Sequence, residues 1–369
     1  MLELMAVADI NLNALQHNLE RVKHYLNHKT RILVAVKADA YGHGAIQVAR
    51  FLEQQGVDYF GVATAAEALE LRQGGVNGNI LIFSPEYHNL EALLEADVQL
   101  SVVNEASLIA AERAAQKLGR SVAVHLKADT GMGRLGQPWP EAAALAQHID
   151  RSKQLELRGV WTHFAQADEA ERDYTNMQLS AFHRLLSELK YAHIDVPLVH
   201  SANSSAVIAY PEAHFDMVRP GIMIYGYHSS PFIAELETEL QPVMTLHASV
   251  TFVKRFKQGQ SLSYSSSWTA PQDCTIATVR IGYADGYPRC LGNRAEVWLR
   301  HARRPIRGRV CMDQLMVDVG DDEVSVGDEV QLFGGKAPCA EEIGQLAGSI
   351  SYEVLTGIGR RVQRVYRES

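Results

Sequence analysis

Residues 34–44 read Val-Ala-Val-Lys-Ala-Asp-Ala-Tyr-Gly-His-Gly, an apolar strand that ends on one lysine and runs into a glycine-rich turn. The strand that we predict over 31–37 delivers Lys37 to its C-terminal end. At the mouth of a buried strand, desolvation lowers the pKa of an amine. A neutral amine is what Schiff-base chemistry with a carbonyl compound needs. The alternative is a lysine that only closes the strand and points to solvent, and this stretch alone does not decide between the two.

Short apolar strands alternate with amphipathic helices on both sides of this stretch, over about the first 235 residues. The predicted strands are 31–37, 58–63, 79–84, 99–103, 122–128, 158–165, 197–202 and 216–220. The segments between them are rich in Ala, Leu, Glu and Gln, as helices are. Eight strand–helix alternations predict an α/β fold with a (β/α)8 TIM-like barrel. An open, doubly wound sheet is the alternative, because the number of strands is a soft prediction from sequence.

The pattern changes near residue 240, where helical periodicity fades and β-branched, alternating runs begin. The predicted strands of this part are 246–252, 275–281, 295–299, 307–310, 315–319 and 329–333, with one helix near 340–347. We therefore predict a barrel over 10–235 and a C-terminal, mainly-β domain over 236–369. Residues 1–9 are candidates to pair with that second domain.

Composition excludes several classes of protein. The 369 residues carry a net charge of −8 with scattered basic residues, which argues against nucleic acid as a partner. No apolar run approaches the ~18 residues of a membrane span, and the opening Met-Leu-Glu-Leu-Met has an acid where a secretory signal carries positive charge. We therefore expect a cytoplasmic protein without a membrane partner. Neither His-Glu-x-x-His nor Cys-x-x-Cys occurs, so we expect no metal site.

Charged residues follow several of the predicted barrel strands. Active sites of such barrels lie at the C-terminal ends of the strands. The residues that gather there are Lys37, Lys127, Arg134, His163 and Arg219. This cationic rim suits an anionic ligand. The last two loops, at 203–204 and 221–222, fall where barrels usually bind phosphate, and Ser204 can offer a hydroxyl and N–H groups there. Each is an ordinary cap or turn when read alone. Together with a strand-end lysine, they predict pyridoxal 5′-phosphate as the cofactor.

The segment Gly131-x-Gly133-x-x-Gly136 matches the dinucleotide-binding fingerprint after a strand. That fingerprint must open a helix. Pro138 and Pro140 follow at once and should break the first helical turns. We therefore disfavour a nicotinamide cofactor.

The motifs taken together resemble those of alanine racemases, pyridoxal-phosphate enzymes of fold type III. The resemblance covers nearly the whole chain. Its most specific segments are residues 36–44, 127–136, 202–204, Arg219 with Gly221, 281–286 and 311–314. It implies an isomerase that interconverts L-alanine and D-alanine through an aldimine of the cofactor with Lys37. It also implies a homodimer whose two chains share each active site.

The resemblance further implies two bases, because racemisation needs a proton acceptor on each face of the substrate. Lys37 is one and Tyr264, reaching the site from the partner subunit, is the other. A free tyrosine titrates near ~10, so Tyr264 needs nearby positive charge, for which His163 and Arg219 are the candidates. Arg219 would face the pyridine nitrogen of the cofactor. Arginine only donates hydrogen bonds, so that nitrogen should stay neutral.

The remaining roles also come from the resemblance. The implied cofactor contacts are Tyr41, Arg134, His163, Asn203, Ser204, Arg219, Gly221, Ile222 and Tyr352. The implied substrate contacts are Arg134, Tyr283, Met312 and Asp313. Lys127 matches a lysine that carries a carbamate, an anion that would orient Arg134. Ser265 stands where the family commonly has glycine. A shift of the loop that carries Tyr264 would affect the rate of the reaction and not its kind, and serine is small.

Three other functions are compatible with parts of the pattern. One is a related racemase for another amino acid such as serine, which the size of the pocket near Tyr283, Met312 and Tyr352 would distinguish. A second is a decarboxylase of the same two-domain fold, whose glycine-rich phosphate loop and cysteine motif are not found here. A third is a pyridoxal-phosphate carrier made of a barrel alone, against which the second domain and Tyr264 argue.

Overall fold

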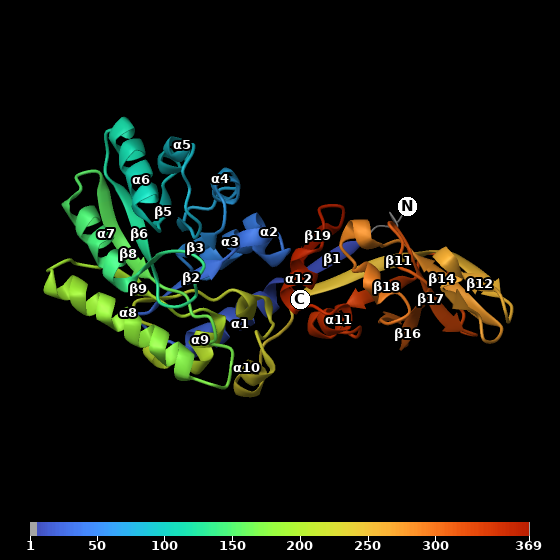
Figure 1. The fold of residues 1–369 in the computed structure, drawn as a ribbon. Helices are drawn as coiled ribbons and strands as arrows, with labels where there is room; N and C mark the ends of the chain where they lie inside the picture. The colour runs from blue at the N-terminus through green and yellow to red at the C-terminus, as the bar shows by residue number, and fades with distance from the viewer. Residues whose placement is uncertain (1–5, 369) are drawn as a thin grey trace. The chain divides into compact units, whose positions relative to one another are not determined.

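The computed structural model describes residues 6–368, which form two compact units (Figure 1). The barrel unit comprises residues 15–40 and 45–241. The β unit comprises the described residues up to Ala14, residues 41–44, and the chain from Pro242 onward. The chain passes between the units after Ala14, at both ends of the segment 41–44, and finally between Gln241 and Pro242.

Eight parallel strands run around the barrel unit in the order β10-β2-β3-β4-β5-β6-β8-β9, with the short β7 beside β6. Their bounds are β2 Arg31–Ala35, β3 Tyr59–Val62, β4 Asn79–Ile82, β5 Val98–Val102, β6 Val122–Asp129, β7 Gln137–Pro138, β8 Leu155–Trp161, β9 Leu198–His200 and β10 Met217–Val218. The N–H of Asp216 donates to the carbonyl of Val199 at 3.0 Å, and the N–H of Arg219 donates to that of Ala202 at 2.8 Å. These bonds join the last two strands. The predicted (β/α)8 barrel is therefore confirmed, and the open sheet is wrong.

A layer of apolar side chains closes the interior of the barrel. Five strands contribute one buried residue each, namely Leu33, Tyr59, Leu81, Leu198 and Met217. Burying a side chain of this size contributes about 1.5–3 kcal/mol. All four residues of β3 are buried, as expected for a parallel strand that is covered on both faces.

Helices surround these strands in Figure 1. The helices up to the junction are α1 Leu12–Tyr25, α2 Lys37–Tyr41, α3 Ala45–Gln54, α4 Ala65–Gln73, α5 Leu90–Glu95, α6 Glu105–Leu118, α7 Trp139–Arg151, α8 Asp173–Tyr191, α9 Ser204–Ala209 and α10 Pro231–Leu236, with 3-10 turns η1 Pro211–Ala213 and η2 Ile222–Tyr225. Capping boxes start two of them. Thr64 and Glu67 cap α4, and Asn104 and Ser107 cap α6.

The β unit is built on one sheet in the order β14-β17-β16-β15-β18-β11-β1-β19, which also pairs β14 with β11. The strands are β1 Val7–Asn11, β11 Met244–Phe256, β12 Ser261–Leu262, β13 Trp268–Thr269, β14 Cys274–Val279, β15 Glu296–Leu299, β16 Ala302–Arg307, β17 Leu315–Gly320, β18 Glu329–Phe333 and β19 Gln363–Arg367. The helical elements are η3 Tyr264–Ser266, η4 Tyr283–Asp285, η5 Arg289–Leu291, α11 Ala340–Ala347 and α12 Ser351–Thr356. The helix predicted at 340–347 is confirmed.

One predicted strand of the β unit is misplaced. The prediction over 307–310 is wrong, since β16 covers Ala302–Arg307 and pairs with β15 across a tight turn at Arg300 and His301. The charged residues of β16 hide its strand character. Its alternation buries Ile306, while the arginines remain at least partly accessible to solvent.

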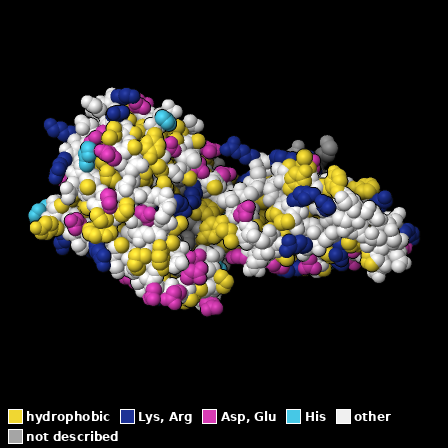
Figure 2. Space-filling model, viewed as in Figure 1, with side chains coloured by type: hydrophobic (Ala, Val, Ile, Leu, Met, Phe, Trp, Pro, Cys, Tyr) yellow, Lys and Arg dark blue, Asp and Glu magenta, His cyan; other side chains and the backbone are white. Residues whose placement is uncertain are grey.

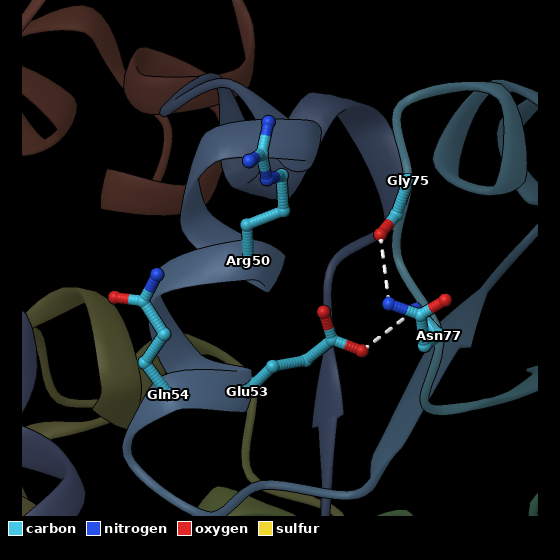
Figure 3. A pocket seen from close by; sticks show the side chains of 5 residues that line it. All are labelled: Arg50, Glu53, Gln54, Gly75 and Asn77. Atoms are coloured by element: carbon cyan, nitrogen blue, oxygen red, sulfur yellow. Dashed lines mark hydrogen bonds between the residues drawn. The ribbon is translucent and has the colours of Figure 1, made fainter.

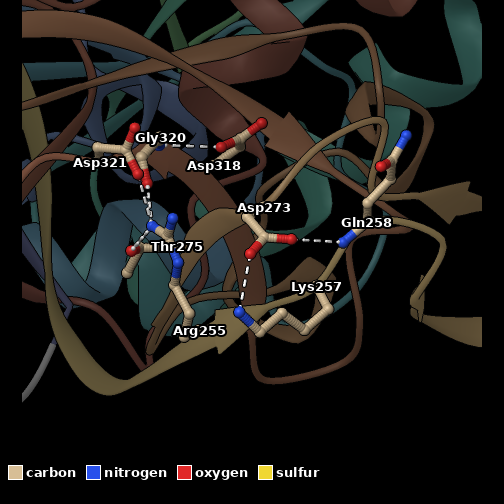
Figure 4. Close-up of polar contacts among 8 residues, drawn as sticks. All are labelled: Arg255, Lys257, Gln258, Asp273, Thr275, Asp318, Gly320 and Asp321. Atoms are coloured by element: carbon tan, nitrogen blue, oxygen red, sulfur yellow. Dashed lines mark hydrogen bonds and ion pairs between the residues drawn. The ribbon is translucent and has the colours of Figure 1, made fainter.

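Exposed ion pairs lie near the C-terminal end of β11 in the β unit. Arg255 on β11 donates to Asp321 at 2.7 Å, and Lys257 donates to Asp273 at 2.8 Å (Figure 4). Exposed pairs of this kind stabilise a protein little. On the face seen in Figure 2, charges of both signs are mixed over both units. No helix within residues 6–368 combines the length and apolar character needed to cross a bilayer.

Candidate active site

Lys37 leaves strand β2 into an unusual backbone turn. Ala38, Asp39, Ala40 and Tyr41 all have φ between 51° and 55°. A left-handed turn of four non-glycine residues is strained, at ~1–2 kcal/mol per residue. The amine of Lys37 is largely withdrawn from solvent, and burial, together with the charge of Arg134, lowers its pKa below the ordinary value of 10.5. The lysine at the C-terminal end of β2 therefore has the lowered pKa that the sequence predicts.

Arg219, just after β10, is buried among acceptors. Its guanidinium donates to the carbonyl of Thr162 at 2.6 Å, to that of Ser201 at 2.9 Å and to Nδ1 of His200 at 3.0 Å. Burial lowers its pKa to about 9, so it stays charged at neutral pH. Nδ1 of His163 lies 3.4 Å from the same group. Arg219 is thus a fixed cation at the ends of β8, β9 and β10.

A chain of buried polar groups holds Arg219 from behind. Because Arg219 always donates, Nδ1 of His200 must accept, and Nε2 of His200 carries the proton toward Nδ1 of His125 at 3.0 Å. His125 then donates from Nε2 to Gln99 at 2.8 Å. Burial and the charge of Arg219 hold the pKa of His200 well below 6.5, and burial lowers that of His125 to about 3. Both rings are therefore neutral.

Lys127 on β6 is a buried amine whose hydrogen bond goes to a backbone carbonyl rather than to a carboxylate. Its Nζ donates to the carbonyl of Ala128 at 2.7 Å and lies 4.9 Å from the ring centre of Trp161. The guanidinium carbon of Arg219 lies 4.9 Å from the same ring. Burial, followed by the charge of Arg219, lowers the pKa of Lys127 to about 7. About half of this amine is therefore neutral near pH 7.

The site has an excess of positive charge. Burial and the charge of Arg219 lower the pKa of His163 well below 6.5, with further contributions from Lys127, Arg134 and Lys37. The opposing carboxylates are Glu67, which acts on Lys37, and Asp129, which acts on Lys127. Arg134 itself is exposed. The structure thus brings the four predicted cations of the barrel into one electrostatic cluster around a neutral His163, which suits an anion.

The two predicted phosphate loops meet within the barrel unit. Asn203 caps α9 and accepts the N–H of Ala206 at 3.0 Å. Oγ of Ser204 accepts the N–H of Gly221 at 2.8 Å. Gly221 precedes Ile222, the first residue of η2. This bond ties the loop after β9 to the loop after β10.

The N–H groups of the glycine-rich loop after β6 form hydrogen bonds within that loop. The carboxylate of Asp129 accepts the N–H groups of Gly131 and Gly133 at 3.0 Å, so these two donors are already used inside the protein. The prediction that Pro138 and Pro140 prevent a helix is wrong. Pro138 is the N-cap of α7 and Pro140 lies in its first turn, where proline is tolerated.

The predicted residues of the β unit fall into two groups. Tyr41 is buried, which raises its pKa to about 12, and its ring lies 6.0 Å from that of Tyr352 on α12. Tyr283 and the loop at 311–313 lie together, since the N–H of Tyr283 donates to the carbonyl of Cys311 at 3.0 Å. Asp313 pairs with Arg361 at 2.8 Å.

Three of the large residues predicted near the substrate are exposed in the single chain. The exposed fractions are 69% for Tyr264, 41% for Tyr283 and 53% for Met312. Ser265 beside Tyr264 has a φ of 58°, the left-handed conformation that favours glycine. The glycine that the resemblance implies here would suit this φ, and serine adopts it at some energetic cost.

Several residues of the site were missed by sequence reasoning. His200 and Trp161 pack with parallel rings 5.9 Å apart, and Thr162 and Ser201 supply carbonyls to Arg219. One available signal was that His125 and Lys127 are two apart on one strand, so both point to the same side of the sheet. Polar residues at inward positions of a barrel strand are unusual enough to indicate a site.

The hollow drawn in Figure 3 does not contain the predicted site residues. It is lined by Arg50, Glu53, Gln54, Gly75 and Asn77. There the Glu53 carboxylate accepts the N–H of Asn77 at 2.8 Å, a local loop contact. Within residues 6–368, no three His, Cys, Asp or Glu side chains gather as metal ligands would.

Comparison with known proteins identifies the family. The alanine racemase N-terminal domain matches residues 10–229, and the alanine racemase C-terminal domain matches residues 243–366. The chain is 42% identical to the alanine racemase of Treponema denticola, with 97% of each protein covered, and 42% identical to that of Desulforamulus reducens, with 97% and 98% covered.

Solved structures agree with the sequence comparison. Alanine racemase of Clostridium difficile 630 superposes with a TM-score of 0.96 at 37% identity, covering 100% of this chain and 97% of that one. The Bacillus anthracis enzyme with bound L-Ala-P superposes with a TM-score of 0.94 at 34% identity, covering 100% and 96%. The fold agrees with these matches over nearly the whole chain, and the chain belongs to the alanine racemase family of isomerases.

Proposed function

We propose that the protein interconverts L-alanine and D-alanine with pyridoxal 5′-phosphate held at the mouth of the barrel unit, with Lys37 and Tyr264 as the two bases. The observation that carries this proposal is the cluster of Lys37, Lys127, Arg134 and Arg219 around His163. Besides burial, Arg134 lowers the pKa of Lys37, Arg219 and Arg134 lower that of Lys127, and all four cations lower that of His163. When bound, the cofactor supplies a carbonyl for the amino group and an electron sink for the α-carbon.

The residues present fit this group. Lys37 offers an amine of lowered pKa, as bonding to a carbonyl requires. The surplus of positive charge suits a molecule that carries a phosphate and a phenolic oxygen. Candidate contacts for the phosphate are Tyr41, Asn203, Ser204, Gly221, Ile222 and Tyr352. Arg134 would contact the phenolic oxygen and the carboxylate of the substrate.

Arg219 sets how strongly the site withdraws electrons. Its acceptors Thr162 and Ser201 fix its plane, and it has only donors to offer to a ring nitrogen. Arg219 would therefore leave the ring nitrogen of a bound cofactor unprotonated. A neutral ring would withdraw electrons weakly, which would favour rapid return of the proton over side reactions.

The two bases act on opposite faces of the α-carbon. Lys37 takes or returns the proton on one face, since its lowered pKa keeps a share of the amine neutral. We assign the other face to Tyr264 of the partner subunit. Its exposure of 69% in a single chain supports this assignment, because a catalytic base is usually covered and a second copy can cover it. Tyr283, Met312 and Asp313 would line the same pocket and keep the substrate small.

Lys127 is the position of the proposed carbamate. A neutral amine adds to carbon dioxide through its nitrogen and releases one proton, which gives an anion. The pKa of about 7 supplies that neutral amine, whereas an ordinary lysine would be protonated. The resulting anion balances neighbouring Arg219 and orients Arg134.

Borohydride trapping tests the assignment of Lys37. Purified protein reduced with borohydride in the presence of pyridoxal 5′-phosphate should carry the pyridoxyl group on the peptide that contains Lys37. The Lys37→Ala variant should carry none. Trapping at another lysine in the wild-type protein would refute the assignment.

A further inference from the structure

Glu67 receives more hydrogen bonds than its place in a helix cap requires. It is the third residue of α4, and its Oε2 accepts the N–H groups of Ala63 and Thr64 at 2.8 and 3.1 Å. These bonds complete the capping box of α4. Its other oxygen, Oε1, accepts the N–H of Ala38 at 2.7 Å. Ala38 belongs to a different strand–helix unit and directly follows Lys37.

The equivalent position of a nearby strand–helix unit shows what the cap alone needs. Ser107 is the third residue of α6, and its Oγ accepts the N–H groups of Val103 and Asn104 at 2.9 and 3.1 Å. Two bonds to the cap and the residue before it therefore suffice to start a helix in this barrel. The bond from Glu67 to Ala38 is additional, and it ends on the turn that carries the active-site amine.

That turn is where outside support is needed. Residues 38–41 all adopt positive φ, a conformation that ordinary side chains avoid and that persists only when surrounding contacts fix it. Two further contacts of the turn lie beyond its first residue. The N–H of Ala40 donates to the carbonyl of Val36 at 2.8 Å, and the carboxylate of Asp39 accepts the N–H of Ala45 at 2.7 Å. Glu67 fixes the first residue.

We propose that Glu67 is a positioning residue for Lys37: its carboxylate holds the start of the left-handed turn and thereby fixes how the lysine side chain leaves β2. The proposal rests on the assigned role of Lys37. The carboxylate also acts on the amine through its charge. Burial and Arg134 lower the pKa of Lys37, and Glu67 opposes them. Removing this charge should lower the pKa of Lys37 further.

The test compares Glu67→Gln with Ser107→Ala. The Ser107 variant loses the equivalent capping-box bonds of α6, which lies far from Lys37 in sequence. Full-length proteins are stripped of carbonyl compounds with hydroxylamine and labelled with acetic anhydride between pH 6 and pH 11. Mass spectrometry of the Lys37 peptide gives its titration. In Glu67→Gln we expect a midpoint roughly half a unit lower, the scale of a partly exposed ion pair, and about tenfold faster amide exchange in peptides covering residues 38–41.

In Ser107→Ala both readouts should match the wild type, even if both variants lose similar thermal stability. Glu67→Asp keeps the charge on a shorter arm, so exchange at residues 38–41 should rise with little change in the Lys37 midpoint. An unchanged Lys37 midpoint and exchange in Glu67→Gln, or equal changes in Ser107→Ala, would overturn the proposal. Since no cofactor is present, that result would leave racemisation and the trapping at Lys37 untouched.

Discussion

Among single residues, Lys127 should have a measurable effect on how the stability of the protein depends on pH. A lysine whose pKa is about 7 when folded and about 10.5 when unfolded binds fewer protons in the folded protein between these values. Stability therefore rises with pH across that window, and the burial penalty is fully present below pH 7. In buffer free of carbon dioxide, the free energy of unfolding should rise by about 2 kcal/mol more from pH 7 to pH 9 in the wild type than in Lys127→Met.

Urea denaturation at the two pH values measures this difference. Equal pH dependence in the two proteins would mean that Lys127 is not a buried, unmodified amine. A second experiment tests for the carbamate itself. With 13C-labelled bicarbonate, the wild type should show a carbamate resonance by NMR that is missing from Lys127→Met.

Single residues also explain which parts of the site could be predicted. Lys37, Arg219 and Ser204 follow apolar strands, and the ends of such strands converge in a barrel whatever the helices between them do. The role of His200, Trp161 and Gln99 in holding Arg219 could not be read in the same way. It depends on which side chains meet inside the barrel, and sequence spacing gives the side of a strand but not the partner across it.

At the scale of elements, the sequence predicts the turn after β2 but not its left-handed conformation at residues 38–41. Ala38 and Ala40 suit an ordinary right-handed helix by propensity. Contacts from Glu67 and Asp39 override that preference. Tertiary contacts also explain the misplaced strand at 307–310. Pairing with β15 makes a strand of the arginine-rich residues of β16, which their propensity does not predict.

Gly42 offers a test of this turn. It has a φ of +83°, and a Cβ there would lie 2.2 Å from the carbonyl oxygen of Leu355 within the β unit. Gly42→Ala should therefore lower the free energy of unfolding by more than about 2 kcal/mol, because backbone must move. Gly56 is the matched control, with a φ of +89° and nothing within 4 Å, so Gly56→Ala should cost only about 1 kcal/mol. Equal losses in the two variants, measured by urea denaturation, would show that the contact with Leu355 is unimportant.

At the scale of the whole molecule, the proposed sharing of sites between two chains predicts complementation. Lys37→Ala and Tyr264→Phe should each be inactive as homodimers, since each lacks one base at both sites. A mixed dimer contains one site with both wild-type residues. Random exchange of subunits should therefore restore at most about a quarter of wild-type activity. If mass spectrometry verifies the exchange of subunits and no activity returns, the proposal that Tyr264 acts in the active site of the partner subunit is wrong.

The most direct test of the proposed function is to follow both enantiomers of alanine with purified protein and added pyridoxal 5′-phosphate. Enantiomers have equal free energy, so reactions started from L-alanine and from D-alanine should both reach equal amounts of the two forms. Lys37→Ala should leave either starting enantiomer unchanged. Failure of the wild-type protein to form D-alanine from L-alanine, or equal rates in the wild type and Lys37→Ala, would contradict the assignment of racemisation to this site.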